Sequence, residues 1–598
     1  MKPIEIRSTL TTRQKINSFL ADLEIPLVVA FGLLGLIFGT LGFRQFYQSL
    51  GQPYTWADSF FQAVQLLSLN SGAVPPDAPV PWMLQVGRFL TPLVTFYAII
   101  KTLAAIFLDQ WHLVRIRFHK DHRIVCGLGR KGWLLVRQIR QQDQPVVIIE
   151  RDPANPHLLE ARHAGCQVVI GDARDPIILQ KAGLQRANAL VAVCGEDNTN
   201  AEVAAQARRQ RTASPNSPLT CTIHIEDPDL WVLLRELEMT TSQESPLRLE
   251  FFNVFENGAY LLARRHLQPE KAGLPPTLLV VGSSRLGQSL VVNLARRWAG
   301  HYKATGERLS IRVVDPQAAR LMDALQARFP LIGEVLDLHP IEMDYQSAEF
   351  HRGGFLVNER GKSAIRQAFV CLEDDSLNLN VGLSLLHQRV NRPAQVIVTQ
   401  WEDGGFADLM EKAAPMDSRL SIFGLLNHTC QSHLLDDGTH ERLARAIHQV
   451  YRRTFTPAPN DPLTGSAHVD WDELPETYRN SNRSQADDIG RKLALLGYRI
   501  RPWVELEAMD FRLDEETEVK PLAREEHLRW LQERLAGGWR YGPQRDNKRK
   551  LNPDLVDWDD PRFTAVAKEK DYNTVRNIPA YLLEAGFQLE KIKKPEHS

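Results

Sequence analysis

The sequence has 598 residues, of which 71 are basic, 72 are acidic and 43% are hydrophobic. A chain of this length exceeds what one hydrophobic core can organise, so we expect several domains. The balanced charge argues against a general nucleic-acid-binding protein, whose surface would be strongly basic, and we expect no nucleic-acid partner. The six cysteines are scattered without a CxxC pair, which argues against a disulfide framework or a zinc site, and we expect no metal.

Two stretches near the N-terminus are long and apolar enough to cross a membrane. The first, Ile25–Phe43, contains no charged residue, and the second, Trp82–Leu108, contains only Arg88 and Lys101. Such lengths match a hydrocarbon core about 30 Å thick. Basic residues precede the first stretch and follow the second, so the positive-inside rule predicts cytoplasmic N- and C-termini. We therefore expect a multi-pass protein embedded in the lipid bilayer of the cytoplasmic (inner) membrane.

The segment between the two stretches has the pattern of a short helix followed by a turn. It reads WADSFFQAVQLLSLNSGAVPP over residues 56–76. A cap at Thr55 or Asp58 and the apolar side chains after it predict a helix, and the Ser, Asn, Gly and Pro residues predict the turn. Irregular backbone at membrane depth must be shielded by protein or line a cavity, which favours a re-entrant loop. A plain extracellular loop stays open as the alternative.

This order of span, short helix, loop and second span resembles the pore unit of two-transmembrane potassium channels. The Gly87–Arg88 pair at the start of the second span adds to the resemblance. Asn70 stands where that family has a filter glycine, and Ser71 stands where it has a tyrosine. A carbonyl-lined filter depends on the backbone freedom of glycine, so the departure favours a pore that is weakly selective or non-selective for cations. A non-conducting relic stays open. The resemblance places the filter at Ser68, Leu69, Asn70, Ser71 and Gly72.

The sequence after the second span contains a dinucleotide-binding pattern. A predicted strand leads into Gly127, Gly129 and Gly132, an amphipathic helix, and a second strand that ends at Glu150. A GxGxxG motif between a strand and a helix, with an acidic residue about twenty positions later, is typical of a Rossmann fold. The glycines let the backbone approach a pyrophosphate, and Glu150 would accept hydrogen bonds from ribose hydroxyls. Arg130 would meet a phosphate, or it is simply solvated.

The same pattern recurs in the second half of the chain. The sequence AFVCLEDDSLNLN at 368–380 echoes ALVAVCGEDNTN at 189–200, and the strands around them echo each other at nearly constant spacing. This predicts an internal duplication. Ser284 replaces the middle glycine and would hold the backbone farther from a phosphate, so a structural role and a binding role both stay open. The candidate residues of the second copy are Gly282, Ser284, Gly287 and Asp315.

The duplicated region resembles the RCK domains, also called Trk-type NAD-binding domains, over roughly residues 120–435. The resemblance implies that the domains pair and assemble into a cytoplasmic ring that acts on the inner helices. With two copies per chain, it implies a homotetramer with a ring of eight domains, joined through the segment 250–267. It also implies NAD or another adenine nucleotide as the regulatory ligand of the first domain. The candidate nucleotide-binding residues are Gly127, Gly129, Arg130, Gly132, Glu150, Arg151 and Asp172.

The C-terminal region resembles the RyR domain, a repeat first named from ryanodine receptors. The motifs EEHLRW, GWRYG, NPDLV and EKDYN occur in order between 525 and 573. Their aromatic and basic residues would form a stacking and phosphate-binding pocket for a soluble nucleotide, or the aromatic residues form the domain core. His527 is expected to be packed and hydrogen-bonded rather than catalytic, and we expect no catalytic residue. The ligand candidates are Trp530, Trp539, Arg540 and Tyr541.

The predicted fold is a membrane α-helical pore (two spans plus a re-entrant pore helix), followed by two α/β Rossmann-like domains and a small, mostly α-helical domain. The predicted function is a nucleotide-regulated ion channel, and the alternative is a membrane-anchored nucleotide sensor with a non-conducting pore that signals to a partner. No substrate-domain signature of an NAD-dependent dehydrogenase is found, so we do not expect an enzyme. The expected segments are an N-terminal cytosolic segment (1–20), the pore domain (21–110) with its pore loop (56–76), the first (111–270) and second (271–455) RCK domains, a linker (456–470) and the RyR domain (471–598).

Overall fold

The computed structural model describes most of the chain as two units, Met1–Arg115 and Ile116–Ser598. The predicted filter residues Leu69, Asn70, Ser71 and Gly72 lie outside the described residues. Side chains are described except in the helical stretches 12–25 and 104–116. The described residues are 12–52, 54–68, 79–116, 121–211, 219–228, 230–231, 233–234, 247–268, 275–357, 365–388, 392–402, 419–430, 439–454 and 468–592.

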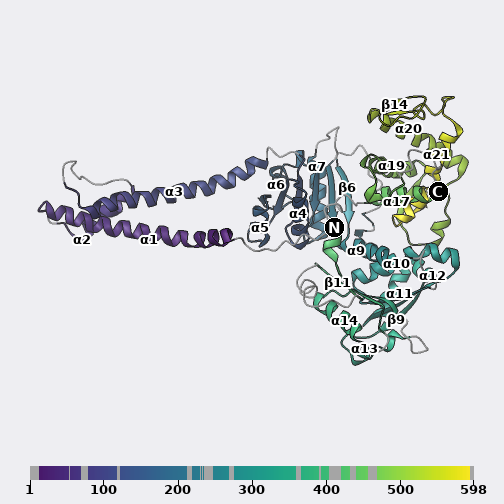
Figure 1. Cartoon of the computed structure of the whole chain (residues 1–598), viewed down its shortest axis with the longest axis horizontal. Coiled ribbons are helices and arrows are strands. Elements are labelled where there is room, and N and C mark those ends of the chain that lie inside the picture. The colour runs from purple at the N-terminus through teal and green to yellow at the C-terminus, as the bar shows by residue number, and fades with distance from the viewer. Residues whose placement is uncertain are drawn as a thin grey trace, which may run out of the picture. The chain divides into compact units, whose positions relative to one another are not determined.

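Two long helices with a short one between them make up the first unit (Figure 1). Helix α1 (Thr12–Ser49) and helix α3 (Trp82–Ile116) carry the two segments that are long and apolar enough to span a membrane, Pro26–Ser49 and Trp82–Leu103. Many of their large apolar side chains face outward, and Phe89 is 75% exposed. Such surfaces need a lipid or protein neighbour. The two predicted apolar helices are confirmed.

Helix α2 (Trp56–Gln65) occupies the predicted position of the short helix, and a 3-10 turn (Leu66–Ser68) follows it. Its first turn is closed by a capping box. The Thr55 hydroxyl accepts a hydrogen bond from the Asp58 backbone N–H at 3.2 Å, and the Asp58 carboxylate accepts one from the Thr55 backbone N–H at 3.1 Å. Insertion of α2 into a membrane as a re-entrant element stays a prediction. The buried cluster between the three helices consists of Phe43, Phe46, Ala63, Leu66 and Leu84.

Glycines bring α1 and α3 into close contact. Gly35, Gly39 and Gly42 recur at helical spacing along α1. A Cβ atom at Gly42 would lie 2.4 Å from the backbone nitrogen of Leu84, and one at Gly87 would lie 2.7 Å from the Cα of Gly39. Between helices in a membrane, packing of this kind replaces the hydrophobic driving force that water would supply. These glycines thus fix how closely the two helices pack.

A six-stranded parallel sheet opens the second unit, with strand order β3-β2-β1-β4-β5-β6. The order reverses at β1, so the carboxyl ends of β1 and β4 flank the crevice where such folds bind ligands. The strands are β1 (Arg123–Cys126), β2 (Val146–Glu150), β3 (Gln167–Ile170), β4 (Ala189–Ala192), β5 (Leu219–His224) and β6 (Leu247–Phe252). The helices are α4 (Arg130–Gln141), α5 (His157–His163), α6 (Pro176–Lys181), α7 (Asp197–Gln210) and α9 (Val254–His266).

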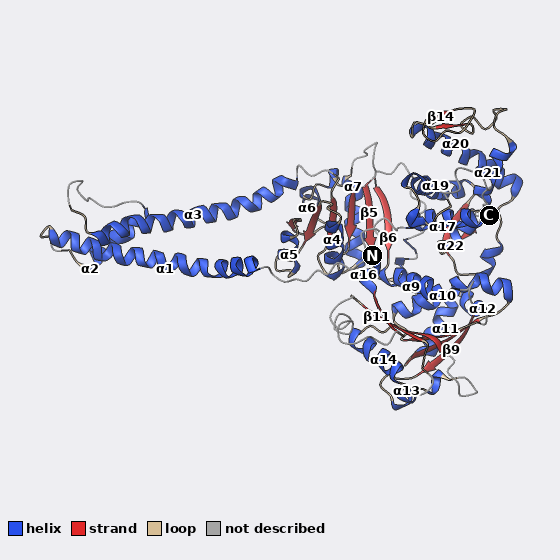
Figure 2. Ribbon diagram, in the orientation of Figure 1, coloured by secondary structure: helices blue, strands red, loops and turns tan. Residues whose placement is uncertain are grey.

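A second six-stranded parallel sheet repeats this order as β9-β8-β7-β10-β11-β12 (Figure 2). The identical topology confirms the predicted internal duplication and both predicted Rossmann-like domains. The strands are β7 (Thr277–Val281), β8 (Leu309–Asp315), β9 (Leu336–Glu342), β10 (Ile365–Val370), β11 (Gln395–Gln400) and β12 (Leu420–Gly424). The helices are α10 (Arg285–Thr305), α11 (Ala318–Arg328), α12 (Pro330–Val335), α13 (Ala348–Arg352), α14 (Asp375–His387) and α16 (Leu425–Thr429).

The two Rossmann copies exchange their last helices. Helix α9, which follows the last strand of the first copy, packs against α10, the first helix of the second copy. Helix α16, which follows the last strand of the second copy, packs in return against α9 and against α4, the first helix of the first copy. A Cβ atom at Gly258 of α9 would lie 2.3 Å from Leu425 of α16. One continuous apolar core therefore serves both copies.

The C-terminal module is mostly helical, as predicted. Helix α17 packs against α19 and α22, and its Leu443 and Ile447 share a core with Ile489 and Leu582. The core thus includes a helix that precedes the expected linker at 456–470. The helices are α17 (Thr439–Thr454), α19 (Glu476–Leu495), α20 (Lys520–Ala536), α21 (Ala565–Arg576) and α22 (Ile578–Glu584), with the short turn η7 (Leu506–Asp510). The strands are β13 (Tyr498–Pro502) paired with β16 (Phe587–Lys591), and β14 (Arg540–Tyr541) paired with β15 (Leu551–Asn552).

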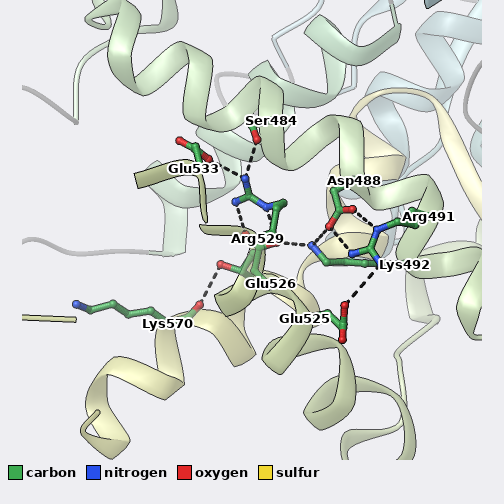
Figure 3. A network of polar contacts seen from close by, with 10 residues as sticks. Ser484, Asp488, Arg491, Lys492, Glu525, Glu526, Arg529, Glu533 and Lys570 are labelled. Atoms are coloured by element: carbon green, nitrogen blue, oxygen red, sulfur yellow. Dashed lines mark hydrogen bonds and ion pairs between the residues drawn. The ribbon is translucent and has the colours of Figure 1, made fainter. Parts of the chain in front are cut away.

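A buried charge network joins α19 to α20 (Figure 3). The Lys492 ammonium, whose side chain is 2% exposed, contacts Asp488 at 2.8 Å and also contacts Glu526. The Arg529 guanidinium lies 2.6 Å from Glu526 and 2.7 Å from Glu533. Burial alone would raise the pKa of Glu526, but the Lys492 and Arg529 cations outweigh it and lower the pKa to about 2. The carboxylate therefore stays ionised inside the module.

Replacing Lys492 by methionine should destabilise the C-terminal module by about 3–5 kcal/mol, because two buried carboxylates lose their shared cation. Chemical denaturation followed by tryptophan fluorescence measures the change. Lys570→Met is the matched control, since its side chain is 66% exposed and surface ion pairs contribute roughly 0–1 kcal/mol. Equal stability of the two variants would show that the network carries no net stabilisation.

Replacing Gly42 by alanine should weaken the packing of α1 on α3. The added methyl group would meet the Leu84 backbone, and overpacking of this kind costs roughly 1–3 kcal/mol. Gly32→Ala is the control, because its Cβ atom would meet only Val94 at 3.6 Å, an ordinary contact. Thermal unfolding of the detergent-solubilised protein should show a lower midpoint for Gly42→Ala alone. Coinciding unfolding curves for both variants would contradict the close approach.

Candidate nucleotide-binding site

The glycine turn of the first copy is tight at both ends and open in the middle. Gly127 has φ of 95°, a conformation that favours glycine. A Cβ atom at Gly132 would lie 2.0 Å from the carbonyl oxygen of Gly127, so any side chain there would displace the turn. Around Gly129, in contrast, no described atom lies within 4 Å of where a Cβ would be. The backbone before α4 is therefore accessible to a ligand phosphate.

Glu150 braces this turn from the end of β2. Its Oε2 atom accepts a hydrogen bond from the backbone N–H of Leu128 at 2.7 Å, and its Oε1 atom accepts one from the N–H of Asp152 at 2.9 Å. The Asn155 side-chain amide also donates to Oε2, at 3.3 Å. A carboxylate offers about four acceptor positions, so Glu150 retains capacity for ribose hydroxyls. The predicted position of this residue beside the glycine turn is thus where the structure places it.

The remaining candidates of the first copy gather at the same sheet edge. Asp172 follows β3 and pairs with Arg174 at 2.7 Å, and these hydrogen bonds lower the pKa of Asp172. Burial, together with the nearby Glu150 and Asp172 carboxylates, raises the pKa of the Cys194 thiol to about 11. Arg151 is exposed next to Glu150. The edge therefore combines acidic acceptors with an exposed cation.

The second copy has the same turn, with hydrogen bonds from two side chains that the first copy lacks. Asp315 accepts a hydrogen bond from the backbone N–H of Ser283 at 2.8 Å, as Glu150 does from Leu128. The Ser284 hydroxyl donates to the Cys371 carbonyl oxygen at 2.6 Å. The Tyr345 hydroxyl donates to the same oxygen of Asp315, Oδ2, at 2.6 Å.

Tyr345 was not among the sequence candidates. Tyr345 follows Asp344 in the second copy, as Ala173 follows Asp172 in the first. An alignment of the two copies at these aspartates shows that a tyrosine stands where the first copy has an alanine. Burial and the hydrogen bond to Asp315 raise the pKa of the Tyr345 hydroxyl, which keeps it protonated as a donor. The first copy offers only a methyl group at this position. The acidic residues of both copies therefore accept three hydrogen bonds each, and the copies differ in the donor that Tyr345 supplies to Asp315 where Asn155 supplies one to Glu150.

The arginines at the start of α4 and α10 reach across to the other copy. The Arg130 guanidinium lies 5.6 Å from the ring centre of Trp401, beside a hollow of about 760 Å³ that Asp375 and Glu402 also line. The corresponding Arg285 pairs with Glu226 of the first copy at 2.7 Å. The structure thus places Arg130 between the copies as well as next to the glycine turn, a contact the sequence did not indicate.

The aromatic candidates of the C-terminal module form a half-exposed surface with arginines between them. The Arg534 guanidinium lies 6.0 Å from the ring centre of Trp530 and 5.6 Å from that of Trp539. Tyr541 is 41% exposed beneath Arg562, and Arg540 is exposed. The candidates Trp530, Trp539 and Tyr541 lie outside the described core cluster of the module.

His527 is packed inside the C-terminal module. Its Nδ1 atom lies 3.1 Å from Asp571 and its Nε2 atom lies 2.8 Å from the Val556 carbonyl oxygen. Its ring packs on Phe563 with the ring centres 4.1 Å apart. Both ring nitrogens are therefore engaged, as expected for a structural histidine. In the described residues, no group of three or more His, Cys, Asp or Glu side chains is arranged to hold a metal ion.

Two segments of the chain match known domain families. Residues 123–241 match the TrkA-N domain, and residues 504–591 match the RyR domain. These matches confirm the predicted Trk-type NAD-binding domain in the first copy and the predicted RyR domain at the C-terminal end.

The curated relatives include potassium channels. The chain is 35% identical over 91 residues to the voltage-gated potassium channel Kch of Escherichia coli, covering 15% of this chain and 22% of Kch. It is 28% identical over 95 residues to potassium channel protein 1 of Methanocaldococcus jannaschii, covering 16% and 28% of the two chains. It is 36% identical over 87 residues to the Trk system potassium uptake protein TrkA of Streptomyces coelicolor, covering 14% and 39%. The chain thus spans less than two fifths of each of these three relatives.

The chain also aligns with solved structures of a channel and of a gating ring. The GsuK channel bound to NAD aligns with a TM-score of 0.37 and 13% identity, covering 71% of this chain and 84% of that chain. The human SLO3 gating ring aligns with a TM-score of 0.36 and 8% identity, covering 53% of this chain and 83% of that chain.

Replacing Gly132 by alanine should destabilise the first Rossmann copy by at least about 1–3 kcal/mol, because the added methyl group overlaps the Gly127 carbonyl oxygen. Gly129→Ala should change stability by less than about 1 kcal/mol, since no described atom lies near its Cβ position. Denaturant unfolding of the purified protein without nucleotide compares the two. A larger loss of stability for Gly129→Ala than for Gly132→Ala would contradict this geometry of the turn.

Proposed function

We propose that the protein is an ion channel of the cytoplasmic membrane whose opening is regulated by nucleotide binding to its cytosolic domains. The observation that carries this proposal is the open glycine turn of a Trk-type domain in a chain that also has two membrane-length helices with a capped short helix between them. The named potassium channels among the relatives support it. Both chain termini are cytoplasmic in this proposal, and α2 is the re-entrant pore helix.

The regulatory ligand is NAD or another adenine nucleotide, bound once per chain in the first Rossmann copy. The pyrophosphate lies against Gly127, Gly129 and Gly132 at the N-terminus of α4, where backbone N–H groups and the helix dipole favour an anion. Glu150 accepts hydrogen bonds from the ribose, which favours NAD- or adenosine-type ligands over NADP-type ones. Asp172 and the exposed Arg151 complete the edge. In this proposal the second copy has a structural role, because Ser284 replaces the middle glycine of its turn and holds the backbone farther from a phosphate.

Four chains assemble around the pore in this proposal, so that eight Rossmann copies form a cytosolic ring. The pore is weakly selective or non-selective for cations, with Ser68 to Gly72 as its filter. Binding alone does not open a channel: the nucleotide must bind the open and the closed ring with different affinities. The C-terminal module supplies a second input to the ring. No nucleic acid takes part.

Planar-bilayer recording of the purified protein tests the channel itself. We expect single-channel currents that NAD or ADP increases or decreases, with reversal potentials that discriminate little between potassium and sodium. Silence with every nucleotide, in a preparation that binds nucleotide, would instead favour a membrane-anchored sensor that signals to a partner. A strong preference for potassium would contradict the predicted filter behaviour.

Replacing Gly129 by serine should abolish nucleotide regulation without unfolding the protein. The change gives the first copy the side chain of the second, and the open space around Gly129 admits it. We expect an affinity for NAD or ADP at least about tenfold lower by calorimetry, roughly 1.4 kcal/mol. Ser284→Ala, at the corresponding position of the second copy, is the control and should leave nucleotide affinity unchanged. If only Ser284→Ala lost nucleotide binding, the ligand would bind in the second copy, and the proposal would be contradicted.

A further inference from the structure

An arginine-lined cavity lies where the Rossmann pair meets the C-terminal module. Its volume is about 720 Å³, within the range of small-molecule sites. Its walls come from α9 and α10 on one side and from α17, α22 and the segment 503–512 on the other. None of the candidate nucleotide-binding residues lines it, and neither do the aromatic candidates on β14 and α20. The cavity is therefore a separate feature of the molecule.

Positive charge dominates the lining of this cavity. Seven lining residues are arginines and two are glutamates. The two glutamates already have partners: Glu256 pairs with Arg296 at 3.2 Å, and Glu584 pairs with Arg453. Arg576 pairs with Glu515 at 2.6 Å outside the lining, so four arginines remain that pair with no carboxylate among the described residues. Because a concentration of like charge in a partly enclosed space is unfavourable, the cavity favours an anionic occupant.

Three of these arginines have neutral partners only, within the described part of the chain. Arg442 donates to the Asn257 side chain and lies 4.9 Å above the ring centre of Tyr260. Arg512 donates to the carbonyl oxygens of Met509, at 2.9 Å, and of Phe511. Arg297 donates to the Leu267 carbonyl oxygen at 3.4 Å. Their remaining N–H donors are available, and a guanidinium binds phosphate through two parallel hydrogen bonds.

Arg296 is a largely buried cation of the cavity lining, with Arg442 as its neighbour. Burial lowers the pKa of its guanidinium, Glu256 opposes that effect, and the neighbouring Arg442 cation lowers the pKa further. Arg296 is held in place because it donates to the Trp503 carbonyl oxygen at 3.2 and 3.0 Å. The two cations therefore face the cavity at fixed positions and repel each other.

Aromatic side chains complete the lining. Tyr260, Trp503 and Phe511 contribute to its walls; Tyr260 and Phe511 are half-buried, whereas Trp503 is buried, with 5% of it exposed. Ring faces beside guanidinium groups are suited to a ligand that combines a planar base with phosphates. An inorganic anion alone would leave these rings unused, whereas a purely apolar ligand would leave the arginines unpaired.

We propose that this cavity is a second ligand site, which binds a nucleotide carrying two or more phosphate groups through Arg297, Arg442 and Arg512. Because the first two belong to α10 and α17 and the third follows η7, such a ligand joins the second Rossmann copy to the C-terminal module. The two bodies already meet here through the Arg296–Trp503 contact and a hydrogen bond from the Leu331 N–H to the Val504 carbonyl oxygen at 2.9 Å. The site does not depend on the channel proposal, since binding alone reveals it.

Calorimetry with ATP on the full-length, detergent-solubilised Gly129→Ser protein tests the site, because that substitution is expected to weaken nucleotide binding at the candidate site of the first copy. We expect saturable binding that weakens at least about tenfold when Arg442→Gln and Arg512→Gln are added. Arg524→Gln is the matched control: its side chain is 60% exposed and it does not line the cavity. Arg512→Gln alone, at an exposed position, should still weaken ATP binding if the double variant does not fold.

Three outcomes would overturn the proposal. The first is no ATP binding to the Gly129→Ser protein at millimolar concentration. The second is an affinity that the cavity substitutions leave unchanged or that Arg524→Gln lowers equally. The third is inorganic tripolyphosphate binding as tightly as ATP, which would show that the aromatic side chains recognise no base. The channel proposal fails separately, through silent bilayers, and leaves this measurement intact.

Discussion

The reciprocal cover of α4 by α16 and of α10 by α9 is the constraint on which the cytosolic structure depends. The outer face of the first helix in each Rossmann copy is apolar and needs a partner, and each copy takes that partner from the other. Neither copy can therefore complete its core alone. The same exchange brings Arg130 to Trp401 and Arg285 to Glu226, so the start of each glycine-turn helix is in contact with the opposite copy. Any ligand at the first turn acts directly beside this shared interface.

Two side chains account for the difference between the copies. Asp315 and Glu150 hold their glycine turns by the same backbone hydrogen bond, so the fold requires an acidic residue in both. Ser284 and Tyr345 then satisfy the polar groups of the second turn from within the protein, as buried polar groups generally require. The duplicated domain thus keeps the fold of the first copy with different side-chain contacts at its turn.

The order of elements was predictable from the sequence, because it rests on local patterns. Apolar stretches of membrane length predicted α1 and α3, and strand, glycine turn and helix in succession predicted both Rossmann copies. Pairings between distant residues were not predictable in this way. The apolar residues of α17 do not by themselves indicate which domain core they join. The structure shows that they belong to the core of the C-terminal module. The arginine cavity gathers residues from 256 to 586, none of which forms a motif. Gly35, Gly39 and Gly42 can likewise be read from the sequence, but only the structure shows that they pack against α3.

The buried charges between α19 and α20 have a consequence for how this protein can evolve. Asp488 and Glu526 balance the charges of Lys492 and Arg529 in one buried network, so a neutral substitution at any one of these positions leaves the other three with a net charge. Replacement of Asp488, Lys492, Glu526 and Arg529 together by apolar side chains of similar volume would avoid that penalty, but each intermediate sequence passes through a destabilised module. Among related sequences, these four positions should therefore be inherited together or be lost together.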